Sequence, residues 1–221
     1  MTAVRAVLFD LDGTLLDTAP DMVGALNALR AEEGLEPLPF LAARGYVSHG
    51  SIALVRIGFG DPPPLRFDVL RRRFLDLYRQ RIAAETRLFP GQGELLDALD
   101  ARGLPWAVVT NKPGWLTEPL LEELNLRHRA GCVVSGDTFA ERKPHPRPLL
   151  HAAAAIGRRP EECVYVGDAQ RDAEAARAAG MRVLMVRYGY FGPHEDPESW
   201  PVDGWIERPQ DLLGWIEARN A

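Results

Sequence analysis

The sequence has few cysteines and no long hydrophobic run. Its two cysteines, Cys132 and Cys163, are isolated from each other in strand-like segments, so neither a disulfide framework nor a paired CxxC site is expected. No stretch approaches the roughly 18 apolar residues of a membrane span. The apolar run near the N-terminus ends at Asp10 and is too short for a secretion signal. We therefore expect a cytoplasmic protein without a membrane partner.

A surplus of basic residues is also absent. The chain of 221 residues has 26 Lys and Arg against 31 Asp and Glu, a net charge of −5, which argues against a nucleic-acid partner. The phosphate-binding pattern GxxxxGK[ST], the serine elbow GxSxG and the zinc pattern HExxH are all missing. The five histidines are scattered, which argues against a zinc site.

Short apolar segments alternate with helical ones from residue 88 onward. Together with a segment near the N-terminus they predict strands over residues 5–10, 105–110, 131–135, 163–167 and 182–189. Nearly continuous apolar strands are typical of a parallel sheet that is covered on both faces. Several intervening segments have helical spacing and end in glycine. This order predicts an α/β fold, a doubly wound, Rossmann-like parallel sheet.

Residues 18–85 have a different texture, because apolar residues recur there at helical spacing and no β-branched run is found. One such stripe contains Val69, Leu70, Phe74, Leu77, Tyr78 and Ile82. A proline-rich turn over residues 60–65 interrupts the segment. We predict a small all-α insert of some four helices. The α/β core would then comprise residues 1–17 and 86–221, and the helical cap residues 18–85.

Polar side chains stand where the predicted strands end. They are Asp10 and Asp12 after the first strand, Thr110 and Asn111 after the second, Lys143 after the third, and Asp168 and Asp172 after the fourth. The carboxyl ends of parallel strands share one edge of a sheet, so these side chains are expected to meet in one pocket. Taken singly, each is also explained as an ordinary turn residue, a helix cap or a solvated charge.

The acidic residues of this pocket predict a metal site. Asp10, Asp12 and Asp168 would repel one another strongly, and burying carboxylates costs free energy unless a cation meets them. Mg²⁺ prefers carboxylate oxygens together with water and phosphate. Thr14, Thr110, Asn111 and Lys143 are donors suited to phosphate oxygens. An aspartate within reach of the phosphorus can act as a nucleophile, and a second one as acid and base.

Four short motifs carry a family resemblance. "DLDGT" (10–14), "TN" (110–111), "KP" (143–144) and "GDAQRD" (167–172), in this order, resemble the motifs of the haloacid dehalogenase superfamily over essentially the whole chain. The insert is similar to that family's small helical cap. Within the family the chain looks most like the phosphoglycolate phosphatase-like enzymes. Among these, "LLDTAPD", "VTNKP" and the tail beginning "VRYGY" are most similar to N-acetylmuramate 6-phosphate phosphatases.

The resemblance implies a role for each motif residue. Asp10 matches a nucleophile that forms an aspartyl-phosphate, and Asp12 matches a general acid whose backbone carbonyl also binds Mg²⁺. Lys143 matches a lysine that offsets negative charge. Asp168 matches a metal ligand that Asp172 supports. Thr14, Thr110 and Asn111 match positions that hold the phosphate.

Substrate choice is expected to come from the cap loop over residues 43–51. Arg44, Ser48 and His49 are candidate substrate contacts there, and a guanidinium suits a substrate carboxylate. A plain turn between helices with solvated side chains is the alternative. Both phosphoglycolate and muramate phosphates carry a carboxylate, so this loop does not separate them.

We therefore expect a Mg²⁺-dependent phosphomonoester hydrolase that acts on a small anionic phosphorylated metabolite, 2-phosphoglycolate or N-acetylmuramate 6-phosphate. A phosphosugar mutase of the β-phosphoglucomutase type would use the same machinery but retain the phosphoryl group. A non-enzymatic sensor of phosphorylated metabolites is a further alternative, disfavoured by the intact Asp10 and Asp12. The expected state is a monomer or homodimer.

Overall fold

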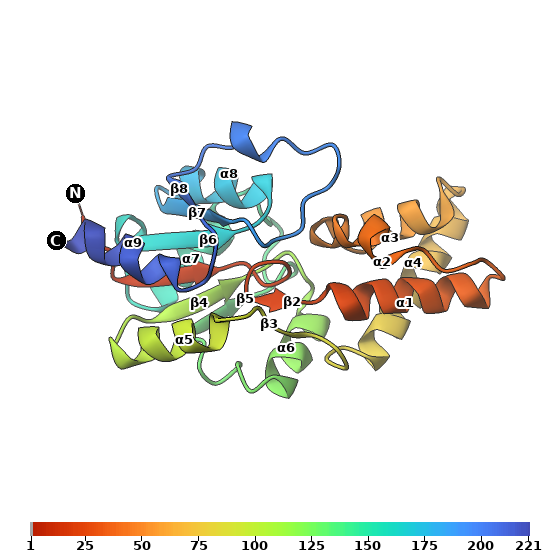
Figure 1. Ribbon diagram of the computed structural model, residues 1–221, viewed down its shortest axis with the longest axis horizontal. Coiled ribbons are helices and arrows are strands. Elements are labelled where there is room, and N and C mark those ends of the chain that lie inside the picture. Colours follow the sequence, from red (N-terminus) through yellow and green to blue (C-terminus); the bar gives the residue numbers. More distant parts are fainter. Residues whose placement is uncertain (1) are drawn as a thin grey trace.

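A six-stranded parallel sheet forms the centre of the computed structural model, which describes residues 2–221 (Figure 1). Its strands are β1 (Ala6–Phe9), β4 (Trp106–Val109), β5 (Cys132–Val134), β6 (Cys163–Gly167), β7 (Arg182–Val186) and β8 (Gly204–Ile206). Their order is β5-β4-β1-β6-β7-β8, and every neighbouring pair is parallel. The predicted doubly wound α/β fold is confirmed.

Helices cover both faces of this sheet. Alternate residues of β1 point to opposite faces, as the two-residue repeat of a strand requires. Val7 and Phe9 pack in the core that includes α5 (Gln92–Ala101), α6 (Gly114–Glu123) and α9 (Asp211–Asn220). Ala6 and Leu8 pack in a second core, with α7 (Arg147–Ala155) and α8 (Gln170–Ala178). The result is a three-layer arrangement with buried strands.

The strands end where the candidate site residues begin. β1 ends directly before Asp10, β4 before Thr110 and β6 before Asp168. These residues therefore start loops at one edge of the sheet, as predicted. β8 was not expected, because a strand of three residues at the sheet's edge leaves almost no signal in the sequence.

Four helices lie beyond that edge, on the right of Figure 1. They are α1 (Ala19–Glu32), α2 (Phe40–Arg44), α3 (Gly50–Phe59) and α4 (Pro64–Gln80), with a short 3₁₀ turn at Val47–His49. The chain leaves and re-enters the core through the antiparallel pair β2 (Leu16–Asp17) and β3 (Arg87–Leu88). Two more 3₁₀ turns span Pro160–Glu162 and Pro197–Ser199. The exact domain boundaries at residues 18 and 85 stay a prediction.

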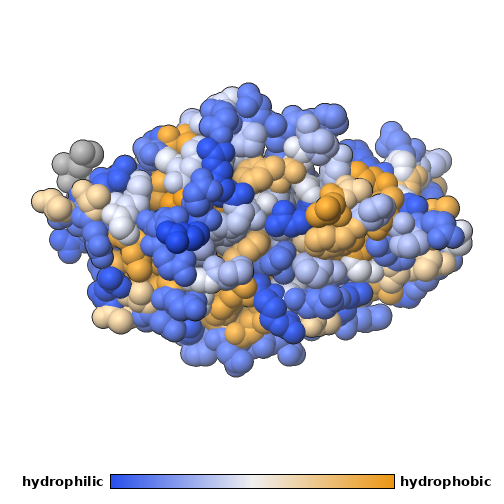
Figure 2. Space-filling view, viewed as in Figure 1, coloured by the Kyte–Doolittle hydropathy of each residue, from blue (hydrophilic) through white to orange (hydrophobic). Residues whose placement is uncertain are grey.

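Of the six residues of the predicted apolar stripe, four are buried, Leu77 is half-buried and Val69 is exposed; the fourth buried residue, Ile82, follows α4. Leu70, Phe74 and Tyr78, four residues apart, are buried, whereas Val69 is 53% exposed. Other exposed apolar residues, such as Leu41 and Leu65, also belong to this helical segment. Figure 2 shows hydrophobic side chains at the surface over these helices, at the right.

The two cysteines and the lengths of the helices bear on the expectations about disulfides and membrane spans. Cys132 and Cys163 are both free thiols. Within residues 2–221, no helix combines the length and the apolar composition that crossing a membrane requires.

Candidate active site

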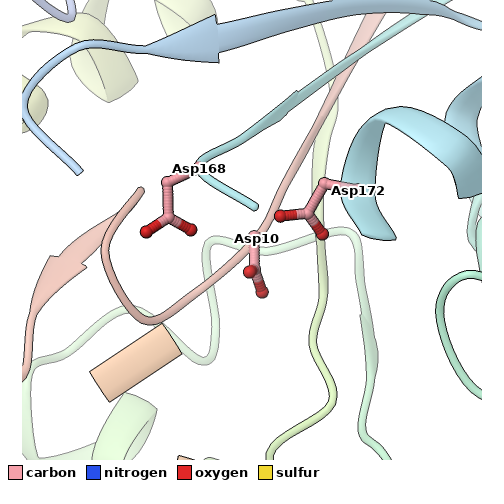
Figure 3. A group of neighbouring side chains, drawn as sticks. All are labelled: Asp10, Asp168 and Asp172. Atoms are coloured by element: carbon pink, nitrogen blue, oxygen red, sulfur yellow. The ribbon is translucent and has the colours of Figure 1, made fainter. Parts of the chain in front are cut away.

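Three aspartates meet at the carboxyl edge of the sheet (Figure 3). Asp10 follows β1, Asp168 follows β6, and Asp172 lies in the first turn of α8. One carboxylate oxygen from each lies within 4.8 Å of the others, and all three residues are buried. Such a cluster is stable only when positive charge is close to it.

Lys143 supplies part of that charge from inside the protein. Its Nζ atom lies 2.8 Å from Asp10 Oδ1 and 2.8 Å from Asp172 Oδ1, and it donates at 2.8 Å to the Val109 carbonyl and to Tyr165 Oη. The ammonium group is fully buried. Burial alone would raise the pKa of Asp172, but the Lys143 and Arg171 charges outweigh it and lower that pKa. Asp172 is therefore held as a carboxylate.

Asp10 has one committed oxygen and one available oxygen. Oδ1 accepts a hydrogen bond from the Leu11 N–H at 2.7 Å and pairs with Lys143. No hydrogen bond from any described residue reaches Oδ2. Burial raises the pKa of Asp10 to about 6, against the lowering effect of Lys143. Asp10 is thus mostly ionised at neutral pH and has one oxygen free to react.

Asp168 is the most strongly perturbed of the three carboxyl groups. Burial, with Asp10 and Asp172 nearby, raises its pKa to about 8. Its Oδ2 accepts hydrogen bonds from Ser48 Oγ at 2.6 Å and from the Tyr190 N–H at 3.0 Å. Gly13 makes room for it: a Cβ at position 13 would lie 2.1 Å from Asp168 Oδ2, and the φ there is +83°. Glycine in the "DLDGT" motif is therefore a steric requirement.

Asp12 does not belong to this cluster and pairs with a different cation. Its Oδ1 pairs with Lys112 Nζ at 2.8 Å and accepts a hydrogen bond from Thr18 Oγ1 at 2.6 Å. The Lys112 ammonium also lies 4.7 Å from the centre of the Tyr78 ring. Burial opposes protonation of Lys112, but the Asp12 and Tyr78 interactions outweigh it and raise its pKa. Lys112 is thus a permanent positive charge beside Asp12.

Besides Lys143, the predicted phosphate donors Thr14, Thr110 and Asn111 lie in different surroundings. Thr110 and Asn111 line the cavity described below, but the buried Thr14 does not. The Asn111 side chain exchanges two hydrogen bonds with the Lys143 backbone, at 3.0 and 3.1 Å. Thr14 Oγ1 instead donates to Asp168 Oδ1 at 3.4 Å. Asn111 thus positions Lys143, and Thr14 contacts Asp168.

A cavity of about 410 Å³ lies between this cluster and the helical segment. That volume suits a small metabolite. Asp10, Asp12 and Lys143 line it from the sheet edge, and Ser48 and His49 line it from the helical side. These predicted contacts are therefore brought together, and His49 Nε2 also lies 3.4 Å from Glu195 Oε1 at this border.

Arg44 is placed differently from the expectation. It is not among the residues that line the cavity. Its guanidinium donates at 3.1 Å to the backbone carbonyls of Tyr188 and Gly189, and it stacks 4.6 Å from the centre of the Tyr190 ring. In this arrangement the side chain fastens the loop to residues 188–190, so the predicted carboxylate contact through Arg44 is not favoured by the geometry.

Comparison with known proteins indicates the same family as the four motifs. The model of the haloacid dehalogenase-like hydrolases matches residues 7–186. The chain belongs to this family. A phosphoglycolate phosphatase of Xanthomonas campestris is 44% identical over 208 residues, which are 94% of each chain. An N-acetylmuramic acid 6-phosphate phosphatase of Pseudomonas aeruginosa is 41% identical over 217 residues, 97% of this chain and 95% of the relative.

Solved structures of the family agree with the fold. The crystal structure of a predicted phosphoglycolate phosphatase from Haemophilus somnus has a TM-score of 0.86 at 29% identity, and the match covers 97% of this chain and 99% of that one. The four motifs and the helical segment all lie within the part of the chain that the family model matches. The predicted family is confirmed.

Several residues that line the cavity were not predicted from the sequence, among them Lys112, Tyr78 and Arg171. Lys112 directly follows the "TN" motif, so its position was a usable signal. Tyr78 belongs to an apolar helical stripe and was assigned to the core on that pattern. Arg171 stands inside "GDAQRD", between the two aspartates that drew attention.

Proposed function

We propose that this protein is a phosphatase that hydrolyses a small phosphomonoester through an aspartyl-phosphate on Asp10. The observation that carries the proposal is the asymmetry of the Asp10 carboxylate. One oxygen is held by Lys143 and the Leu11 N–H, and the other has no partner among the described residues while the side chain lines the cavity. A nucleophile needs this combination of fixed orientation and a free lone pair.

In the first step Asp10 Oδ2 forms a bond to phosphorus as the ester P–O bond breaks. Lys143 offsets the negative charge that gathers between the carboxylate and the phosphoryl oxygens. Asp12 delivers a proton to the leaving alkoxide and afterwards takes one from the water that attacks the phosphorus of the aspartyl-phosphate. That attack releases inorganic phosphate and restores the Asp10 carboxylate.

Lys112 positions Asp12, the proposed general acid and base. Its ammonium lies 2.8 Å from Asp12 Oδ1, which Thr18 Oγ1 also contacts at 2.6 Å. These two partners fix the Asp12 carboxyl group beside the cavity, so that proton transfer starts from a defined orientation. Because these partners occupy Oδ1 of Asp12, its Oδ2 is the oxygen that exchanges a proton with the leaving group.

The acidic cluster fits Mg²⁺, because it offers hard oxygen donors and holds more negative charge than Lys143 balances. Asp10 and Asp168 would hold the ion through carboxylate oxygens, and Asp12 through its backbone carbonyl. When bound, the ion supplies positive charge for phosphoryl oxygens. Asp172 instead anchors Lys143. The helices of residues 18–85 act as a cap that closes the cavity over the substrate in the cytoplasm.

The substrate we propose is a carboxylate-bearing phosphomonoester such as 2-phosphoglycolate or N-acetylmuramate 6-phosphate. Phosphate release should be measured over a panel that contains both compounds, each with Mg²⁺. Release without any added sugar bisphosphate supports the hydrolase. Turnover of a sugar phosphate only after addition of a bisphosphate would instead indicate a mutase, and binding without turnover would indicate a sensor.

Magnesium affinity should depend on pH in a defined direction. A cation must displace the proton that Asp168 retains up to a pKa of about 8 in the metal-free protein. We expect the dissociation constant for Mg²⁺ to fall as pH rises from 6 to 8, by up to about tenfold per pH unit for one released proton. Calorimetric titrations with Mg²⁺ in buffers of different ionisation enthalpy measure the dissociation constant and the number of protons released.

The stability of the metal-free protein provides the matching control. The folded pKa of Asp168 lies above its ordinary value of 3.8, so the unfolded chain loses this proton first. The free energy of unfolding should therefore decline as pH rises from about 4 to about 8 in excess chelator, and Mg²⁺ should reverse the decline. A Mg²⁺ affinity that is flat over this range would contradict the place of Asp168 in the site.

A further inference from the structure

Two residues of the cavity wall each carry a side-chain polar atom without a hydrogen-bond partner in the described part of the chain. Among the described residues, four side-chain atoms are shielded from solvent without any hydrogen bond: Tyr78 Oη, Gln92 Nε2, Arg171 Nε and Arg182 Nη1. Of these four residues, only Tyr78 and Arg171 line the cavity. Leaving a buried donor unpaired costs free energy unless a ligand meets it. Arg171 and Tyr78 are therefore the wall residues whose polar groups have unused hydrogen-bonding capacity.

Arg171 enters from the core, in the first turn of α8. Its Nη2 donates at 2.6 Å to the backbone carbonyl of Ser48, in the loop on the opposite wall. Within the part of the chain that the structure describes, no carboxylate lies within ion-pair distance of its guanidinium. Arginine keeps its charge at any working pH. The cavity wall therefore holds a half-buried positive charge whose Nη1 makes no hydrogen bond to a described residue.

The other cations at the cavity are already engaged or lie at its rim. Lys143 is enclosed by Asp10 and Asp172, and Lys112 is paired with Asp12. Arg71 donates through Nε to Ser51 Oγ at the exposed edge, and Arg142 is exposed. Among the described residues, Arg171 is thus the cavity's one half-buried cation that forms no ion pair, although Asp172, Asp10 and Asp168 attract it from a longer distance.

Tyr78 faces the same space from the helical side. It is fully buried on α4, and burial raises its pKa to about 12, so that the phenol stays protonated. The Lys112 ammonium can interact only with the phenol oxygen, so the hydroxyl proton remains a neutral donor. A group bound between the two residues would receive a charged donor from the core and a neutral donor from the cap.

We propose that Arg171, with the Tyr78 hydroxyl as a second donor, binds a carboxylate on the leaving group of the substrate. This inference rests on the proposed phosphatase function. The planar guanidinium edge matches a carboxylate in two parallel hydrogen bonds. A second phosphoryl group is a poorer match, because it carries a charge of about −1.5 to −2 and the described cavity wall offers it one half-buried cation without an ion pair.

The test compares pairs of phosphomonoesters in which one member has a carboxylate and the other lacks it. N-acetylmuramate 6-phosphate is paired with N-acetylglucosamine 6-phosphate, and 2-phosphoglycolate with ethyl phosphate. Arg171→Gln should lower kcat/KM for the carboxylate-bearing member of the hydrolysed pair by roughly 10- to 150-fold, the range of one charged hydrogen bond. The carboxylate-free member should change little. Tyr78→Phe should show the same preference with a loss of about 2- to 10-fold.

Two further variants separate recognition from positioning. Arg44→Gln removes a guanidinium that holds backbone carbonyls outside the cavity, so it should affect both members of a pair equally. Arg177→Gln is the matched control, since it lies on the same helix and pairs with Asp203 at 3.1 Å, away from the cavity. Its kinetics should be unchanged on every substrate.

The outcomes that overturn the inference are distinct from failure of the function. Equal losses on both members in Arg171→Gln would make Arg171 a positioning residue for the Ser48 loop or a phosphate contact. If Arg171→Gln folds poorly, Arg171→Lys and Tyr78→Phe take its place in the test. The proposal is refuted if both of these variants keep the full preference for the carboxylate-bearing substrate. Absence of phosphate release from every substrate by the unaltered protein would instead refute the phosphatase function.

Discussion

Asp10→Asn is expected to abolish turnover while the protein stays folded. An amide cannot attack phosphorus as a carboxylate does, so kcat should fall on the order of 10⁴-fold or more. The fold should persist because the amide oxygen can still accept from the Leu11 N–H, 2.7 Å from Oδ1 in the structure, and from Lys143. Asp172 also remains to neutralise that lysine. Single-turnover phosphate release and an unfolding curve measure the two effects.

The nucleophile can also be trapped directly. Beryllium fluoride should form an adduct on Asp10 of the unaltered protein in the presence of Mg²⁺, and the Asn variant should form none. Asp61→Asn is a suitable control, since this carboxylate is 95% exposed on the helical segment. Turnover near the unaltered rate in Asp10→Asn would move the nucleophile to another residue.

The fold follows from local patterns that physical chemistry constrains strongly. β1 and β6 are continuous apolar strands with polar residues directly after them, and this arrangement has few solutions other than a covered parallel sheet. Because such strands end at one edge, the meeting of Asp10, Asp168 and Asp172 follows from topology alone. The edge strand β8 is the counterexample, since it depends on pairing with β7 more than on its own three residues.

The cavity wall was harder to predict, because its residues depend on how the helical segment sits against the core. Tyr78 has the spacing of a core residue and is buried like one, yet it also belongs to the cavity wall. Arg44 has the chemistry of a carboxylate binder, but backbone carbonyls of residues 188–189 use its donors. Whether a charged side chain binds substrate or backbone is decided by contacts between segments far apart in the chain.

The buried charge of Lys143 stabilises the three carboxylates at the cavity. Removing this lysine should lower both stability and activity strongly. Its ammonium lies 2.8 Å from both Asp10 and Asp172 and is fully buried. Lys143→Met leaves these carboxylates without that cation. Breaking a buried ion pair in this way typically costs about 3–5 kcal/mol of stability. Catalysis should fall with it, because the charge beside the nucleophile is lost.

The sign of the pH dependence distinguishes this cause from simple loss of packing. With Lys143 present, the pKa of Asp172 is lowered, so its contribution to stability is present above its ordinary pKa and disappears in acid. Without Lys143, burial raises the pKa of both carboxyl groups, and the variant loses stability as pH rises from about 4. The difference between the two proteins should therefore be large at pH 7.5 and small near pH 4.5, in urea titrations with excess chelator.

A second substitution tests the assignment further. Asp172→Asn removes one of the two carboxylates that Lys143 neutralises, so adding it to Lys143→Met should recover part of the lost stability at pH 7.5. It should recover no activity, because the nucleophile still lacks the ammonium 2.8 Å from its Oδ1. A stability loss that is equal at both pH values would mean that packing of the lysine's methylenes, and not its charge, holds the site together. Recovery of turnover in the double variant would show that Lys143 serves the fold alone.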